Sequence, residues 1–342
     1  MNKVGKVPFL DFINRFRGIA ILIIVAYHSL TVRLVSWEDD SVCLKVLRTL
    51  LSDCTILFIF ISGYLFNHLL PRFSYKSYLK KKVKFVISPY LVMSAPAVLF
   101  MILDFNIIEK PWIYNTGLMN KSVLTDILLL EITGSQWYHF WFIPMMIIFY
   151  LLAPAFRFVA NNPVMYYSIP VILIIAFVVG RPADNSNPFQ SFLYYLPVYM
   201  LGSFSSQFHL PVRKVIIKYW YFLVILFLFS SYIIFSGNIR SVSLFQKIIL
   251  CYIVLALMIR LDHLKAPILE ILATYSFGIY FIHMYVIHLV SWIVSFLGLG
   301  FLKSMGIFSY FLFLLLVTFI SYLLLRLSKM ILKDNSRMII GC

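Results

Sequence analysis

Charged residues are scarce in this sequence. Asp, Glu, Lys and Arg make up 12% of the 342 residues, whereas hydrophobic residues make up 62%. Soluble domains carry about 25% charged and about 50% apolar residues, so the composition excludes a soluble globular protein. It also excludes a disordered chain, because disordered chains contain too few apolar residues to form a core. The remaining class is an integral membrane protein.

Cysteine and the familiar ligand-binding motifs are scarce or missing as well. The four cysteines show no CxxC spacing, so the sequence predicts neither a disulfide framework nor a metal site. There is no GxxxxGKS or GxxxxGKT for ATP, no HExxH for zinc, no GxSxG and no GxGxxG. The chain therefore lacks the usual signs of a nucleotide-binding enzyme, a zinc protease or a serine hydrolase.

Long apolar stretches fill most of the chain. A membrane-spanning helix needs about 20 apolar residues, and ten stretches approach or exceed that length: 18–34, 46–70, 83–103, 141–158, 164–179, 189–208, 219–235, 244–259, 268–297 and 306–325. They predict an all-α polytopic membrane protein of about ten transmembrane helices. We expect residues 1–342 to form a single membrane-embedded domain without an appended soluble domain.

The formal net charge of +16 is explained mainly by topology. An even number of spans places both termini on one side, and 20 of the 29 Lys and Arg fall on that side. Because basic residues concentrate in cytoplasmic loops, both termini are predicted to be cytoplasmic. The charge therefore gives no reason to expect a nucleic-acid partner.

Two ionisable residues mark the first span. Arg17 and His28 are eleven positions apart, which at ~100° per residue is three turns plus about 20°, so both lie on one helix face about 16 Å apart. An arginine at the cytoplasmic mouth with an imidazole deeper in the membrane suits a cleft for an anionic ligand. The alternative is a topology-setting arginine and a histidine that hydrogen-bonds a neighbouring helix.

The ninth span carries a polar stripe. Ser276, Tyr280 and His283 recur at helical spacing on one face, whereas His288 lies ~140° away from His283. The stripe indicates either a functional site or a helix–helix hydrogen bond.

Two further segments carry chemistry. Trp137, His139 and Trp141 lie where the fourth span begins; such rings form either an interfacial belt or a sugar-stacking surface. The loop at 71–90 is rich in lysine. Such a loop binds either anionic lipid or the phosphates of a nucleotide-like ligand.

These four segments, in this order, resemble the motifs of the acyltransferase-3 family of integral membrane acyltransferases. Arg17 and His28 match the family's Arg-x10-His pattern, and ISGYLF at 61–66 resembles the motif that closes its second span. HFWFIP at 139–144 and YSFGIYFIH at 275–283 resemble its fourth-span and ninth-span motifs. The resemblance covers nearly the whole chain.

The resemblance implies a membrane-bound O-acyltransferase. Such an enzyme takes an acyl group, usually acetyl, from cytoplasmic acyl-CoA to a hydroxyl of O-antigen, another surface polysaccharide or a lipid-linked sugar. It implies a multi-pass protein of the bacterial inner membrane, with acetyl-CoA as donor and membrane lipid and the sugar acceptor as partners. Oligomeric state stays open.

The resemblance also implies roles for individual residues. Catalytic roles fall to His28, Arg17 and His283. Donor binding falls to Arg17, Arg72, Lys80, Lys81, Lys82, Lys84, Ser62 and Tyr64. Acceptor binding falls to Trp137, His139, Trp141, Tyr280 and Ser276.

Two other classes remain open at this point. A secondary transporter or flippase of a sugar or sugar-lipid also places ionisable residues at mid-membrane, although no inverted pair of broken helices is found in the sequence. A non-catalytic partner of a polysaccharide synthase would not need the line from Arg17 to His28.

Overall fold

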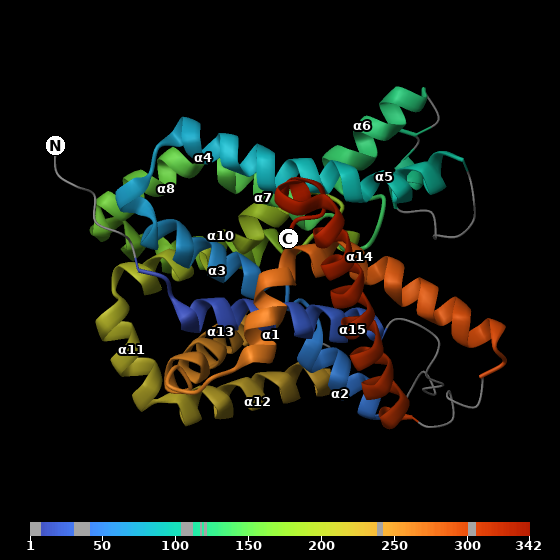
Figure 1. The fold of residues 1–342 in the computed structure, drawn as a ribbon. Coiled ribbons are helices and arrows are strands. Elements are labelled where there is room, and N and C mark those ends of the chain that lie inside the picture. Colours follow the sequence, from blue (N-terminus) through green and yellow to red (C-terminus); the bar gives the residue numbers. More distant parts are fainter. Residues whose placement is uncertain are drawn as a thin grey trace. The chain divides into compact units, whose positions relative to one another are not determined.

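The computed structural model describes residues 8–30, 42–103, 112–116, 118–119, 122–237, 242–299 and 306–342. The structure is 85% helical, and no strand occurs within these ranges (Figure 1). The prediction of an all-α fold is confirmed. The chain forms two compact units, each described by itself. The first holds residues 62–207 and 334–341, and the second holds residues 8–61, 208–333 and 342.

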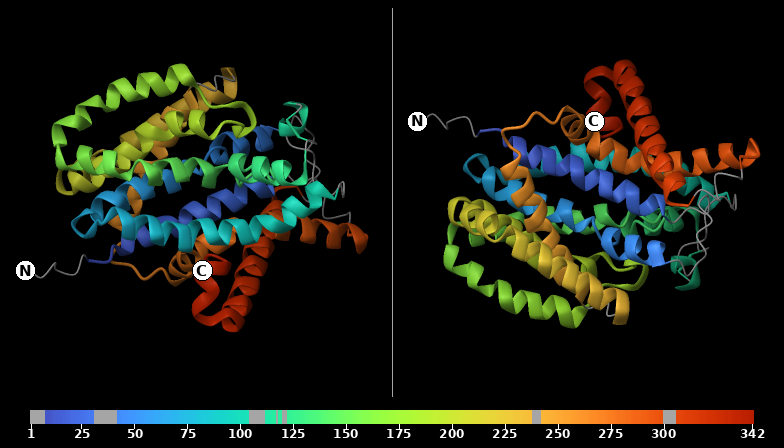
Figure 2. Two further views of the ribbon diagram at one scale, coloured as in Figure 1. Left: turned by 90° about the horizontal axis from the view of Figure 1, so that it is seen from above. Right: turned by 90° about the horizontal axis from the view of Figure 1, so that it is seen from below.

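The second unit is organised around its N-terminal helix. Its helices are α1 (Asp11–Ser29), α2 (Val42–Leu51), the start of α3 (Ile56–His68), α11 (His209–Lys218), α12 (Trp220–Gly237), α13 (Ser243–Arg260), α14 (Pro267–Phe296) and α15 (Ile307–Leu332). Helix α1 contacts α2, α13, α14 and α15, and α12 lies along α13 (Figures 1 and 2).

The first unit contains most of the chain's short helices. They are the end of α3, η1 (Leu70–Arg72), α4 (Tyr75–Lys82), η2 (Val83–Ile87), α5 (Ser88–Ile102), η3 (Trp112–Thr116), α6 (Val123–Thr133), α7 (Phe142–Leu151), α8 (Ala153–Asn161), η4 (Pro163–Ser168), α9 (Ile169–Val179), η5 (Ala183–Asn185), α10 (Pro188–Gln207), the end of η8 (Lys333–Asn335) and α16 (Ser336–Ile339). Helix α9 packs along α10 (Figure 2).

Several of these helices are suited to cross a membrane. In the described chain six are long and apolar enough: Val42–His68, Tyr75–Ile102, Trp220–Gly237, Ser243–Arg260, Pro267–Phe296 and Ile307–Ile339. The pair α7–α8, bent by 57°, would add a seventh. Each of the ten apolar stretches overlaps a helix or helix pair, and residues 31–34 of the first stretch lie outside the described ranges. A multi-pass membrane protein is therefore confirmed, whereas the number of about ten spans, and their union in a single domain, stay predictions.

A buried lysine stabilises the break between α2 and α3. Lys247 on α13 is fully buried, and its Nζ donates hydrogen bonds to the carbonyl oxygens of Leu50 (2.8 Å) and Thr49 (3.1 Å) at the end of α2. Asp53 then takes a left-handed backbone conformation (φ 57°) and accepts a hydrogen bond from Ser243 Oγ at 3.0 Å. The ammonium thus pairs with helix-end carbonyls that apolar surroundings would leave without donors.

Helices α1 and α14 approach each other closely at Gly18. A methyl group built on Gly18 would overlap the backbone of Leu269, near the start of α14. Only glycine allows two helix backbones to come this near, and small residues serve this purpose in membrane helix packing. Gly18 therefore sets the distance between the two helices.

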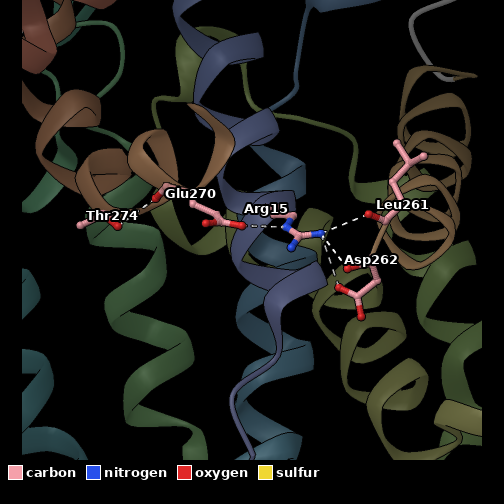
Figure 3. Close-up of polar contacts among 5 residues, drawn as sticks. All are labelled: Arg15, Leu261, Asp262, Glu270 and Thr274. Carbon is pink, nitrogen blue, oxygen red and sulfur yellow. Dashed lines mark hydrogen bonds and ion pairs between the residues drawn. The ribbon is translucent and has the colours of Figure 1, made fainter. Parts of the chain in front are cut away.

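Arg15 fixes the same helices electrostatically (Figure 3). Its side chain is nearly buried, and its Nε donates to Glu270 Oε1 at 3.2 Å in the first turn of α14. Its Nη1 donates to the carbonyl oxygens of Leu261 and Asp262, both at 3.1 Å, just after α13. One guanidinium thus joins the start of α1, the end of α13 and the start of α14.

We predict that Gly18→Ala destabilises the protein. The added methyl group must push the Leu269 backbone away, and such overpacking costs about 1–3 kcal/mol. The thermal unfolding midpoint of the detergent-solubilised variant should fall clearly below that of the wild type. Gly237→Ala, the same exchange at the exposed end of α12, is the control. Equal midpoints for the two variants would contradict the close approach.

Candidate active site

The α1–α14 interface brings four of the predicted residues together in two pairs. The first pair joins Arg17 to Ser276: the Arg17 Nη2 donates a hydrogen bond to Ser276 Oγ at 3.0 Å. Ser276 in turn donates to the carbonyl oxygen of Ala273 at 2.8 Å, one turn back on α14. The lone pairs of the Ser276 hydroxyl therefore face Arg17, and this hydrogen bond fixes the direction of the guanidinium.

The second pair joins His28 to His283. Their ring centroids lie 5.2 Å apart, with 49° between the ring planes. His283 is fully buried, and His28 is half-buried. The prediction that Arg17 and His28 share one helix face is confirmed, because both side chains contact the polar stripe of α14.

The backbone of α14 fixes the tautomer of His283. Its Nδ1 lies 3.0 Å from the carbonyl oxygen of Ile279 and 2.8 Å from that of Tyr280. A carbonyl oxygen only accepts hydrogen bonds, so Nδ1 must carry the proton in the neutral ring. The lone pair of His283 is then on Nε2, the nitrogen on the other side of the ring from the helix backbone.

Tyr280 also lies inside the second unit. It is almost fully buried, and its ring centroid is 6.3 Å from that of His283. It sits near the imidazole pair, one turn before His283 on α14.

The aromatic segment of the first unit differs from a simple interfacial belt. Trp137, His139 and Trp141 are all buried, whereas Tyr138 is 57% exposed. Trp141 stacks on Tyr195 with ring centroids 5.8 Å apart, and the Arg181 guanidinium lies 5.6 Å from the Trp141 ring. The belt alternative fits Tyr138 but not the two buried tryptophans, which are interior groups of this unit.

The lysine-rich segment at 71–90, expected to be a loop, is mostly helical, because it forms α4, η2 and the start of α5. Its basic residues are of two kinds. Arg72, Lys80, Lys81 and Lys84 are exposed. Lys82 instead packs inward, with its Nζ 4.3 Å from the Tyr150 ring centroid and 5.3 Å from that of Tyr78.

The two remaining donor-binding candidates lie on α3, within the first unit: Tyr64 is nearly fully buried, and Ser62 is half-buried.

A polar cavity in the first unit was not predicted from the sequence. It has a volume of about 540 Å³, and its lining includes Asn67, His68, Arg157, Asn161 and Gln207. Asn67 Nδ2 donates to Gln207 Oε1 at 3.0 Å and lies 3.4 Å from the Tyr166 hydroxyl. The sequence feature that could have indicated this cavity is Asn67, a polar residue near the end of the apolar stretch at 46–70.

The comparison with known families settles the assignment. The acyltransferase-3 family model, described as an acyltransferase domain, matches residues 10–326. The chain belongs to the acyltransferase-3 family. No curated protein and no solved structure matches it. Both helices of the candidate site in this acyltransferase-3 protein lie inside the matched range.

The two pairs of this acyltransferase-3 protein contain groups whose general chemistry suits acyl transfer. An imidazole can accept the proton of an attacking hydroxyl, and a guanidinium can bind an anionic group of the donor. Within the described ranges, no three His, Cys, Asp or Glu side chains lie together so as to hold a metal ion.

We predict that neutral His283 is the Nδ1–H tautomer. Protein carrying nitrogen-15-labelled histidine should give, for this residue, a protonated Nδ1 and an unprotonated Nε2 in long-range proton–nitrogen correlation spectra. The His283→Gln variant assigns the resonance by its loss. A protonated Nε2 with a bare Nδ1 would contradict the two backbone hydrogen bonds.

Proposed function

We propose that this acyltransferase transfers an acetyl group from cytoplasmic acetyl-CoA to a hydroxyl of a surface polysaccharide, such as O-antigen, or of a lipid-linked sugar. The bacterial inner membrane is the proposed location. The observation that carries the proposal is the pairing of His28 with His283 on the interface where Arg17 pairs with Ser276. It combines a proton acceptor with a cationic anchor.

The donor is bound by its phosphates and extends along α1. The guanidinium of Arg17, oriented by Ser276, binds a phosphate at the cytoplasmic end of the helix. About 16 Å separates Arg17 from His28 along the helix axis, which suits the extended pantetheine arm of coenzyme A. The residues Arg72, Lys80, Lys81 and Lys84 add exposed positive charge on the predicted cytoplasmic side; Lys82, Ser62 and Tyr64 complete the proposed donor set.

The acetyl group moves to the sugar oxygen by attack on the thioester. The acceptor hydroxyl gives its proton to the imidazole of His28 while its oxygen bonds to the carbonyl carbon. The carbon–sulfur bond then breaks, and the CoA thiolate leaves and takes up the proton. Alternatively His28 first accepts the acetyl group itself and passes it to the hydroxyl in a second step. Both routes begin with a lone pair on the His28 ring.

His283 and Tyr280 support this step. Because the backbone of α14 holds the Nδ1 proton of His283, its Nε2 can accept a hydrogen bond from His28 or from the acceptor hydroxyl. Tyr280 orients the acceptor or stabilises the oxyanion that forms on the thioester carbonyl. On the acceptor side, we assign sugar contacts to Trp137, His139 and Trp141, whose rings suit stacking on a sugar face.

We predict that His28→Ala lowers kcat for transfer of labelled acetyl from acetyl-CoA to polysaccharide by about 100-fold or more, the usual contribution of a general base. His263→Ala, which removes an exposed histidine between α13 and α14, is the matched control and should keep wild-type activity. Full activity in a well-folded His28→Ala protein would disprove the proposed role.

We predict that Arg17→Met raises the KM for acetyl-CoA about tenfold or more, because a hydrogen bond to a charged group is lost. The KM for the acceptor should stay near the wild-type value. Arg326→Met, at an exposed position near the end of α15, controls for the loss of one basic residue. An unchanged KM for acetyl-CoA in Arg17→Met would contradict the assignment of Arg17 to the donor.

A further inference from the structure

A group of four hydrogen-bonded residues in the first unit, the Glu131 cluster, has no role in the mechanism above. It consists of Tyr90, Ser94, Glu131 and Gln136. The Tyr90 hydroxyl donates to the carbonyl oxygen of Glu131 at 2.8 Å and accepts from Gln136 Nε2 at 2.9 Å. Ser94 Oγ donates to Glu131 Oε1 at 2.6 Å.

The turn after α6 places this cluster beside the aromatic segment. Helix α6 begins at a Ser122 cap, whose oxygen accepts from the Thr125 amide, and ends at Gly134, which has a φ of +71°. A methyl group on Gly134 would overlap the backbone of Trp141 and Phe140. Only glycine combines this left-handed conformation with so close a contact. The chain therefore folds back with Glu131 and Gln136 next to residues 137–141.

Ring contacts connect the cluster to His139. The Tyr90 and Phe140 ring centroids lie 5.8 Å apart, and those of His139 and Phe140 lie 4.1 Å apart. Trp137 follows, with its ring centroid 6.2 Å from that of His139. The cluster and the proposed sugar-contacting residues thus form one continuous region of the first unit.

Two oxygen atoms of the cluster are buried without a donor. Glu131 Oε2 and Gln136 Oε1 have no hydrogen-bond partner in the described structure, and Gln136 is fully buried. The orientation of the Gln136 amide is set by Tyr90, because the single O–H of Tyr90 already donates to the Glu131 carbonyl. Buried acceptors without donors are unfavourable and rare in folded proteins. A ligand with two hydrogen-bond donors would satisfy both.

The charge state of Glu131 depends on the hydrogen bonds that its carboxyl accepts. Its burial raises its pKa, while the hydrogen bond from Ser94 and the nearby Tyr90 hydroxyl oppose the rise. A further donor on Oε2 would replace hydration that burial has removed. Two acceptor oxygens, one of them on a carboxyl group, would repel a phosphate, so the complementary ligand is a neutral polyol rather than the nucleotide part of coenzyme A.

We propose that Glu131 Oε2 and Gln136 Oε1 accept hydrogen bonds from two hydroxyl groups of the sugar acceptor, so that the Glu131 cluster is a specificity-determining part of the acceptor site. This inference rests on the proposed function, which supplies a sugar as the second substrate. It adds to the aromatic residues a pair of acceptors that selects for the arrangement of the sugar's hydroxyls.

Glu131→Met and Gln136→Met test the proposal, because methionine keeps the side-chain length and removes the acceptors. Ser94 Oγ keeps the Leu91 carbonyl as an acceptor, and the Tyr90 hydroxyl keeps the Glu131 carbonyl. The probe is the source cells' own surface polysaccharide, freed of O-acyl groups by mild alkali. Each variant should raise the KM for this polysaccharide about tenfold and leave the KM for acetyl-CoA unchanged.

A second readout separates a binding role from a structural one. Each methionine variant also loses one hydrogen bond of the cluster, from Ser94 Oγ or to the Tyr90 hydroxyl, so its unfolding midpoint should fall somewhat. A binding role predicts a raised polysaccharide KM in the folded variant, whereas a purely structural role predicts a lower midpoint with an unchanged polysaccharide KM. Gln190→Met, the same exchange elsewhere in the first unit, loses a hydrogen bond to the Val179 carbonyl and should keep the wild-type polysaccharide KM. A folded Glu131→Met or Gln136→Met protein with that KM would overturn the proposal and indicate that the cluster holds water.

Binding without the donor distinguishes this inference from the proposed function. The polysaccharide alone should raise the unfolding midpoint of the wild type but not of Glu131→Met or Gln136→Met. If the wild type is protected in this way and yet transfers no acetyl group, the proposed function fails and the binding site stands. If the methionine variants do not fold, Glu131→Gln, which keeps the Ser94 contact and exchanges Oε2 for an NH₂ donor, takes their place. Wild-type protection of that variant would overturn the site.

Discussion

The close packing of α1 on α14 is the constraint on which the candidate active site depends. Lipid offers little hydrophobic driving force between helices, so association relies on close backbone approach and polar contacts. Gly18 permits that approach against Leu269, and Arg15 joins the start of α1 to α14 through Glu270. With the start fixed, the helical repeat carries Arg17 to Ser276 and His28 to His283.

Two arginines two positions apart on α1 make different contacts. The guanidinium of Arg15 donates hydrogen bonds to helix-end carbonyl oxygens and to Glu270, whose side chain is 44% exposed. An ion pair with so exposed a partner stabilises the fold by at most about 1 kcal/mol, so the carbonyl contacts and the geometry matter more than the charge pairing. Arg17 contacts a neutral hydroxyl. A structural cation and a candidate ligand-binding cation thus lie within one turn of the same helix.

Helical periodicity predicted which polar side chains of the second unit share a helix face. The Glu131 cluster of the first unit depends on long-range contacts, which periodicity does not predict. The spacing of Arg17 and His28, and of Ser276 and His283, fixes which residues share a face. It does not fix that the two faces meet. Glu131 and Gln136 gain their significance from Tyr90, more than 40 positions earlier in the chain. Likewise Lys247 lies near the start of the apolar stretch at 244–259. Only its buried contact with the end of α2 shows that it binds the helix-end carbonyls.

The contacts along the α1–α14 interface also carry information about how the chain is threaded. Residues 15 and 18 contact residues 270 and 269, residue 17 contacts 276, and residue 28 contacts 283, so both helices run in the same direction. Two transmembrane segments with the same sense must be separated by an odd number of crossings. The ten-span prediction places seven crossings between them, which is an odd number. One crossing more or fewer between residues 30 and 266 would make that number even and would be incompatible with parallel helices.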